Sequence, residues 1–266
     1  MVATAPTPYR RARHLVRTQV SKYPALYLPF ARRKYPGPSP EVIGPDTELV
    51  IDGYTRSATT FAVYALQLAQ DRPVRMAHHL HAPAQLIAAA RAGVPTLALI
   101  REPRGAILSQ LVREPDVAMR DALVAYTRFY RCLLPYRDRF VVGGFDEVTG
   151  DFGAVVRRLN ARFGTAFAEF AHTDEAVREC FELVRYRGTL SGTLLGFESG
   201  TVTAAELHRE RASLARAAGA LDTREAWVPS LDRQRAKDEL KARWQSPRLA
   251  RLKARAEHVY QQFMAR

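Results

Sequence analysis

Residues 48–69 read ELVIDGYTRSATTFAVYALQLA, and their pattern is the strongest indication of the fold. Glu48 to Gly53 is a short apolar run typical of a buried strand, and Thr59 to Ala69 has the apolar spacing of a helix packed against it. A strand, a tight loop and a helix in this order bring backbone N–H groups and the positive end of the helix dipole to one point. The stretch therefore predicts an anion-binding loop of the P-loop type.

The residues that follow repeat this alternation of strand and helix. Further strands are predicted at Thr96 to Ile100 and Arg139 to Gly144, and helices at Pro83 to Ala92, from Pro103 onward, at Asp121 to Tyr136 and at Phe152 to Phe163. After residue 172 the pattern is helical, over Ala204 to Ala218, Asp232 to Trp244 and Arg248 to Phe263. We expect an α/β protein with a P-loop-like three-layer α/β/α fold, a central parallel sheet and a helical C-terminal third.

The length of 266 residues suits one large α/β domain. A polar, proline-bearing stretch from Tyr35 to Asp46 is typical of a connector. We therefore divide the chain into an N-terminal arm and linker, residues 1–47, and an α/β domain, residues 48–266.

The balance of charges favours anionic ligands. The chain has 40 Lys and Arg against 27 Asp and Glu, a net charge of +13. No basic run interleaved with aromatic residues stands out, so a nucleic acid partner is not expected. Arg10, Arg11, Arg13 and Arg17 could hold a basic helix on a membrane surface, although a solvated helix face is commoner. No apolar run is long enough for a signal peptide or a span, which favours a cytoplasmic protein without stable membrane insertion.

The loop after the first strand departs from the nucleotide-hydrolysing P-loop pattern GxxxxGK[ST]. Gly53 and Thr60 match this pattern, but Ala58 replaces its second glycine and Thr59 its lysine. A triphosphate would lack its main charge partner there. A P-loop kinase acting on a small molecule would also need an acidic Mg²⁺ ligand after a later strand, where Asp146 is the candidate. For this loop alone, a Ser- and Thr-rich helix cap without a ligand is a further alternative.

A second loop of the same kind follows the central strand. Residues 100–109 read IREPRGAILS and open the next predicted helix. In doubly wound sheets ligands gather outside the carboxyl ends of the strands, so both loops could face one nucleotide. The planar guanidinium of Arg101 suits a phosphate group. The alternative for this segment alone is that Arg101 and Arg104 are solvated or salt-bridged residues at a helix start.

Together the two loops resemble the motifs of one enzyme family. Residues 55–61 (TRSATTF) resemble the PKSGTTW-like loop, and residues 101–109 the RDPRDxxxS motif, of the PAPS-dependent sulfotransferases of the bacterial, cytosolic type. The resemblance implies transfer of a sulfuryl group from 3′-phosphoadenosine 5′-phosphosulfate (PAPS) to an acceptor hydroxyl or amine by in-line displacement. The product would be adenosine 3′,5′-bisphosphate (PAP), and no metal would be needed.

The resemblance also implies a role for individual residues. Arg56 would stabilise the leaving phosphate oxygen, Phe61 would lie near the adenine, and Arg101 with Ser109 would hold the 3′-phosphate. The implied donor-binding set is Arg56, Ser57, Ala58, Thr59, Thr60, Phe61, Arg101 and Ser109. Two departures from the family matter: arginine for lysine at Arg56 changes the geometry of the cation, and Ala58 for glycine is unfavourable if that position needs a positive φ.

A histidine cluster lies between the two loops. Residues 78–81 read HHLH, and histidine is the natural proton acceptor near neutral pH. His79 followed by Leu80 resembles the family's TH-L-P context, which implies that His79 takes the acceptor's proton. His81 or a carboxylate is the alternative base. No further ligand cluster accompanies these histidines, so no metal is expected.

The later residues are less informative. Arg233, Arg235 and Lys237 resemble weakly a third basic loop over the 3′-phosphate, and a solvated helix face explains them as well. The glycine-rich residues 188–200 predict a mobile loop near the acceptor. The acceptor can be a carbohydrate, a lipid, a secondary metabolite or a phenol, and a non-catalytic polyanion-binding protein is the remaining alternative to an enzyme.

Overall fold

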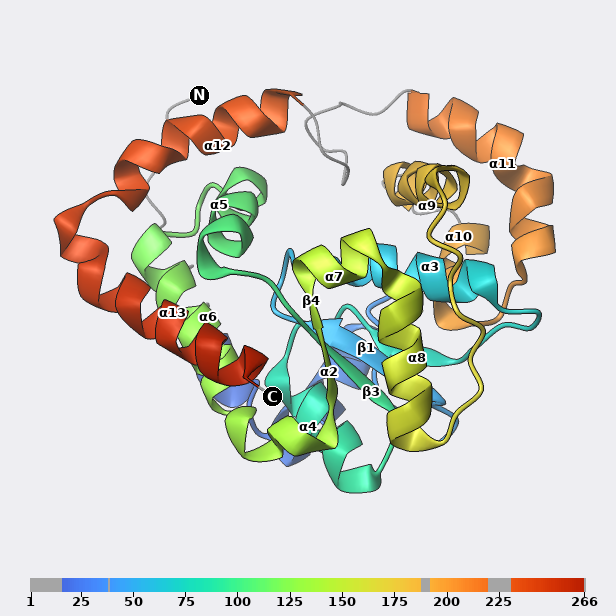
Figure 1. Cartoon of the computed structure of the whole chain (residues 1–266), viewed down its shortest axis with the longest axis horizontal. Coiled ribbons are helices and arrows are strands. Elements are labelled where there is room, and N and C mark those ends of the chain that lie inside the picture. Colours follow the sequence, from blue (N-terminus) through green and yellow to red (C-terminus); the bar gives the residue numbers. More distant parts are fainter. Residues whose placement is uncertain (1–15, 38, 188–191, 220–230, 266) are drawn as a thin grey trace.

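The centre of the protein is a sheet of four parallel strands, β1 (Leu49–Gly53), β2 (Met76–His78), β3 (Thr96–Ile100) and β4 (Val141–Gly144). The computed structural model describes residues 16–37, 39–187, 192–219 and 231–265. The strand order is β2-β1-β3-β4 (Figure 1). Val50 of β1 is in register with Ala77 of β2 and Thr96 of β3, so the first strand is central and buried throughout.

Helices cover both faces of the sheet because neighbouring strand residues point to opposite sides. Leu49 and Ile51 belong to one hydrophobic core, and Val50 belongs to the other. The first core is closed by α3 (Thr59–Ala69), α8 (Phe152–Phe163), α9 (Asp174–Tyr186), α10 (Gly192–Ser199) and α11 (Ala204–Gly219). The second is closed by α2 (Pro24–Lys34), α4 (Pro83–Ala92), α5 (Pro103–Arg113), α6 (Met119–Arg131) and α13 (Ala250–Met264). This arrangement confirms the three-layer α/β/α fold, the parallel sheet and the helical C-terminal third.

Several predicted elements have the predicted bounds, and others do not. The helices α3, α4 and α8 and the strand β3 begin and end where the apolar pattern places them. The predicted helix from Asp121 to Tyr136 is too long: α6 ends at Arg131, and a 3₁₀-helix spans Leu134–Arg139. Pro135 explains this end, because proline cannot continue an α-helix.

Two further features differ from expectation. The strand β2, three residues long, was not predicted, since so short a run carries no periodicity. The loop predicted at residues 188–200 is wrong for its described part, where α10 is a helix. Leu194 and Phe197 of α10 are buried against the core, so packing outweighs the local glycine content.

The strand order positions the site. The chain passes from β1 to β2 on one side and returns to β3 on the other, so the loops after β1 and β3 leave adjacent strands toward helices on opposite faces. Such a switch point opens a crevice at the carboxyl ends of the strands. The helix α7 (Phe145–Gly150) follows β4 at the same edge, and α12 (Leu231–Trp244) lies over α5 (Figure 1).

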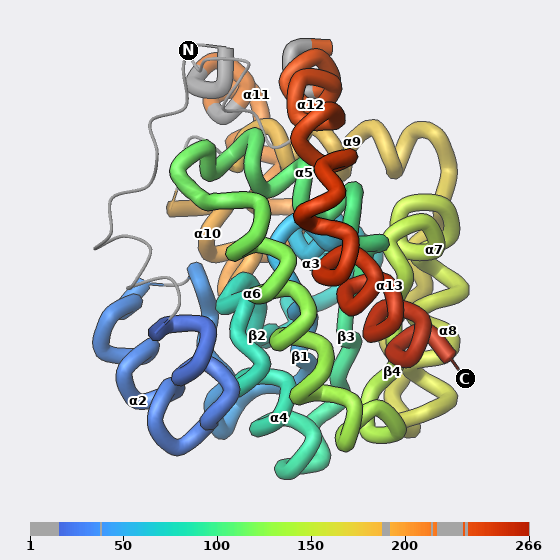
Figure 2. The backbone as a smooth tube through the Cα atoms, turned by 90° about the vertical axis from the view of Figure 1, so that its left-hand side faces the viewer, coloured from blue at the N-terminus to red at the C-terminus, as the bar shows by residue number. Residues whose placement is uncertain are grey.

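The N-terminal arm packs on the domain through α2. Tyr27, Leu28 and Ala31 are buried in the core that α4 shares. Figure 2 shows α2 beside α4. Glu41 forms an isolated antiparallel bridge with His78 of β2, which ties the connector to the sheet edge. Within the described ranges, no helix has the length and apolar content needed to cross a bilayer.

Candidate active site

The two predicted anion-binding loops line one pocket of about 360 Å³ at the carboxyl ends of β1 and β3. This volume lies in the usual range of small-molecule sites. Of the residues predicted to bind the donor, those that line the pocket are Arg56, Ala58, Thr59, Thr60, Phe61, Arg101 and Ser109. Ser57 does not: its side chain is fully buried, with the hydroxyl 3.5 Å from the Tyr130 hydroxyl. Ser57 therefore does not form part of the pocket surface.

The two arginines of the motifs lie in contact. Nε of Arg56 donates to Oγ of Ser109 at 3.0 Å, and Nη1 of Arg101 donates to the carbonyl of Arg56 at 3.5 Å. The guanidinium of Arg101 also stacks 3.7 Å from the ring centroid of Phe145, a cation–π contact that orients its plane. Burial lowers the pKa of Arg101, while the nearby Glu102 and Asp146 raise it. Two positive groups from separate loops thus share one pocket.

The backbone around the pocket is strained. Four non-glycine residues in the described ranges have positive φ: Arg56 (70°), Ala58 (69°), His79 (59°) and His81 (49°), and all four line the pocket. Each left-handed residue other than glycine costs about 1 kcal/mol or more. Such strain is characteristic of functional sites, where it holds groups in geometries that function requires. Ala58 adopts the conformation that a glycine would adopt more easily at this place.

A buried hydroxyl in the pocket is unpartnered. Oγ1 of Thr59, whose residue is 4% exposed, makes no hydrogen bond within the described residues. Buried hydroxyls are almost always hydrogen-bonded, so this atom has a place for a ligand acceptor. Thr59 opens α3, where the helix N-terminus also favours an anion. The hydroxyl and the two guanidinium groups together fit a ligand that carries more than one negative group.

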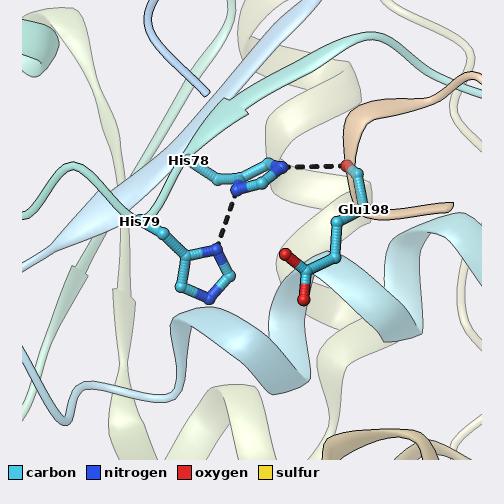
Figure 3. A group of neighbouring side chains, drawn as sticks. All are labelled: His78, His79 and Glu198. Carbon is cyan, nitrogen blue, oxygen red and sulfur yellow. Dashed lines mark hydrogen bonds between the residues drawn. The ribbon is translucent and has the colours of Figure 1, made fainter. Parts of the chain in front are cut away.

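His79 is part of a chain of hydrogen bonds that runs from Thr60 to the backbone of Glu198. Its Nε2 lies 2.9 Å from Oγ1 of Thr60, and its Nδ1 lies 2.8 Å from Nδ1 of His78. Nε2 of His78 in turn lies 2.9 Å from the backbone carbonyl of Glu198 (Figure 3). These four residues come from α3, from the end of β2 and from α10.

The hydrogen bonds fix the tautomer of His79. A carbonyl can only accept, so Nε2 of His78 carries a proton and Nδ1 of neutral His78 accepts one from Nδ1 of His79. Nε2 of His79 is then left with a lone pair, toward which the Thr60 hydroxyl donates. Burial lowers the pKa of His79 well below its usual range, and the charge of Arg187 adds to this effect. His79 is therefore neutral near pH 7, with Nε2 as its basic atom.

The carboxylate next to these histidines is already paired. Oε1 of Glu198 accepts from Nε of Arg187 at 2.6 Å and from the Tyr64 hydroxyl at 2.6 Å. Atoms of His78, His79 and Glu198 lie within 4.8 Å of one another and are of types that bind metals (Figure 3). The sequence did not indicate Glu198 as a neighbour of these histidines; its carboxylate accepts hydrogen bonds from Arg187 and Tyr64, and the two histidines bond to each other.

His81, the alternative to His79 as the base, also lines the pocket. Nδ1 of His81 donates to the carbonyl of Gly53 at 2.9 Å, and the backbone N–H of His81 donates to the buried carboxylate of Asp52. Among the described residues that line the pocket there is neither an aspartate nor a glutamate. Asp146, the candidate Mg²⁺ ligand of the kinase alternative, is therefore not part of this lining.

The structure adds pocket residues that the motifs did not indicate. Phe145 and Thr149 of α7 and Phe181 of α9 line the pocket, although no sequence pattern connects them with the two loops. The C-terminal basic residues differ in whether they line the pocket. Lys237 of α12 lines the pocket and Arg235 does not, while the side chain of Arg233 lies outside the described residues.

Fold and site together define an α/β protein with a P-loop-like fold and a pocket lined by two arginines at the switch point of a parallel sheet. No protein-family model matches the chain, and no curated protein matches its sequence. Among solved structures, the chain is similar to that of mouse sulfotransferase SULT7A1 complexed with PAP. The TM-score is 0.39 at 11% sequence identity, over 80% of this chain and 90% of that chain.

Proposed function

We propose that this chain is a PAPS-dependent sulfotransferase. The observation that carries the proposal is the contact between the two anion-binding loops: Arg56 donates to Ser109 at 3.0 Å, and Arg101 reaches the backbone of Arg56. A nucleotide with phosphate groups at both its 5′ and 3′ positions needs two such cationic points in one pocket.

The donor-binding roles follow from the elements that carry each residue. Arg56 lies in the P-loop-like turn before α3 and Thr59 is the first residue of that helix, so both would face the 5′-phosphosulfate. Arg101 and Ser109 lie in the loop and helix after β3 and would hold the 3′-phosphate. Phe61 lines the same pocket as an apolar surface for the adenine.

The reaction is an in-line displacement at sulfur. The donor supplies an activated sulfuryl group: the bond from sulfur to the acceptor oxygen or nitrogen forms while the bond from sulfur to the 5′-phosphate oxygen breaks. Nε2 of His79 would take the acceptor's proton, because it carries the lone pair. Arg56 would balance the negative charge left on the phosphate oxygen. Positioning and fixed charge then supply most of the catalysis.

The proposal is tested first by selective binding. The melting temperature of the full chain is measured with PAP, with ATP plus Mg²⁺, and with duplex DNA. A ligand at about 100 times its Kd stabilises the native state by about 2.7 kcal/mol, so PAP should raise the melting temperature and the other two should not. A selective rise with ATP plus Mg²⁺ would favour a kinase, and one with DNA a polyanion-binding protein.

Two matched variants locate this binding. Arg101→Gln should abolish most of the PAP-induced shift, because it removes a cation from the pocket. Arg104→Gln should leave the shift unchanged, since Arg104 is exposed and does not line the pocket. Turnover is then measured with isotopically labelled PAPS against panels of phenols, carbohydrates and lipids, read by mass spectrometry. Binding of PAP without transfer to any acceptor would leave a nucleotide-binding protein, not an enzyme.

A further inference from the structure

Large apolar side chains are exposed on the N-terminal arm. In the described residues the exposed large hydrophobic side chains are Val16, Tyr23, Leu26, Phe30 and Leu231. All but Leu231 belong to the arm. Tyr23, Leu26 and Phe30 are spaced three and four residues apart, which puts them on one side of α2 and of the turn before it. They are 50%, 64% and 57% exposed, and we call this surface the arm face.

The arm face is the outer side of a helix whose inner side is already packed. Tyr27, Leu28 and Ala31 bury the inner side of α2 in the core, and Figure 2 shows α2 at the periphery of the molecule. The exposed side chains are therefore not needed for packing α2 onto the domain. Several exposed apolar residues gathered on one helix face indicate an interaction surface, whereas single ones do not.

Cations surround the arm face, and acids are absent from this part of the sequence. Nζ of Lys22 lies 4.9 Å from the ring centroid of Tyr23, and Nζ of Lys34 lies 5.8 Å from that of Phe30. Arg33 is also exposed. The first 40 residues contain eight Lys and Arg and no Asp or Glu. The arm face thus combines aromatic and aliphatic groups with positive charge alone.

We propose that the arm face docks on the surface of an anionic lipid bilayer. Aromatic and leucine side chains flanked by lysine and arginine suit the boundary between lipid head groups and acyl chains, where the apolar groups enter and the cations meet lipid phosphates. A second copy of the chain is a less favourable partner for the arm face. A two-fold contact would bring Lys22, Arg33 and Lys34 toward their own counterparts, and like charges repel. The helix lies on the bilayer and does not span it.

This inference does not depend on the proposed function. Tyr23, Leu26 and Phe30 do not line the candidate active site, so variants of the arm face leave the residues of that pocket unchanged. The full chain is sedimented with vesicles of phosphatidylcholine alone and with vesicles of phosphatidylcholine and phosphatidylglycerol in equal amounts, at rising sodium chloride. The variants are Leu26→Ser with Phe30→Ser, and Arg33→Glu with Lys34→Glu. The matched control is Leu231→Ser, which removes a leucine elsewhere that is 78% exposed, more than Leu26.

We expect binding to the anionic vesicles that weakens as salt rises, with little binding to phosphatidylcholine alone. The double serine variant should reduce the apparent partition coefficient about tenfold or more, because full burial of one large apolar side chain already contributes about tenfold. The double glutamate variant should reduce it similarly, and Leu231→Ser should leave it unchanged.

Three outcomes would overturn the proposal. The first is no sedimentation with anionic vesicles, and the second is equal sedimentation of the double serine variant and Leu231→Ser. The third is a concentration-dependent dimer in analytical ultracentrifugation that the double serine variant disrupts, which would assign the arm face to a second copy of the chain. Circular dichroism and thermal melting of each variant confirm that lost binding does not reflect unfolding.

Discussion

Gly105→Ala tests the geometry of the second loop without removing a charge. Gly105 lies in the first turn of α5, where its backbone N–H donates to Oε1 of Glu102 at 2.6 Å. An added Cβ would lie 2.1 Å from Oε1 of Glu102 and 2.8 Å from Nε of Arg101. The carboxylate must therefore move by roughly 1 Å or more and give up the cap, and the Arg101 guanidinium must shift with it.

The expected magnitudes separate stability from binding. Loss of the cap costs about 1 kcal/mol, and alanine in place of glycine in a helix regains up to about 1 kcal/mol. The two changes nearly cancel, so the melting temperature should move by less than the roughly 2–4 °C that a net change of about 1 kcal/mol would produce. A displaced Arg101 loses a charge-assisted hydrogen bond to phosphate, about 1.5–3 kcal/mol, so the Kd for PAP should rise about 10- to 100-fold.

Isothermal titration calorimetry with PAP and thermal melting measure the two quantities on the same protein. Gly150→Ala is the matched control, because a Cβ at Gly150 would have no neighbour within 4 Å. The reasoning would be refuted if Gly105→Ala bound PAP with the wild-type Kd, or if both glycine variants weakened binding equally.

The other predictions concern the buried groups beside the pocket. His79→Gln should lower turnover about 100-fold or more and leave the Kd for PAP nearly unchanged, as measured with labelled PAPS; equal turnover would remove His79 from the reaction. Burial depresses the pKa values of His78 and His79, so between about pH 6.5 and these depressed values the unfolded chain binds more protons than the folded one. The contribution of the two neutral histidines to the free energy of unfolding is therefore fully present above about pH 7. It is lost as the pH drops, by up to about 1.4 kcal/mol per pH unit for each histidine. Urea midpoints measured from pH 8 to 5 should therefore fall less in His79→Gln than in the wild type. Arg187→Met leaves the carboxylate of Glu198 buried without its cation, and urea unfolding should show a loss of about 3–5 kcal/mol; a loss under 1 kcal/mol would mean that Glu198 is protonated or solvated in the variant.

The bounds of single helices and strands, and the two arginine-bearing loops, could be predicted from the sequence. The bounds of α3 and β3 follow from the apolar spacing over Thr59–Ala69 and the apolar run over Thr96–Ile100, and both patterns operate within one element. The order of the two loops, each with an arginine between a strand and a helix, indicated two anion-binding points. Parallel strands bring such loops to one edge, which is why a prediction from separate segments had both loops face one nucleotide, and Arg56 and Arg101 line one pocket.

The side chains that surround the two arginines and the histidines depend on the tertiary structure and could not be predicted from the sequence. The hydrogen bond between His78 and Glu198 joins residues 120 positions apart, and only the packing of α10 beside β2 creates it. The contact of Phe145 with Arg101 depends in the same way on β4 lying next to β3. The strand β2 and the helix α10 themselves have weak local signals, and burial against the core stabilises them. Periodicity reports the face that one element buries, whereas the partner of that face is set by contacts between elements distant in the chain.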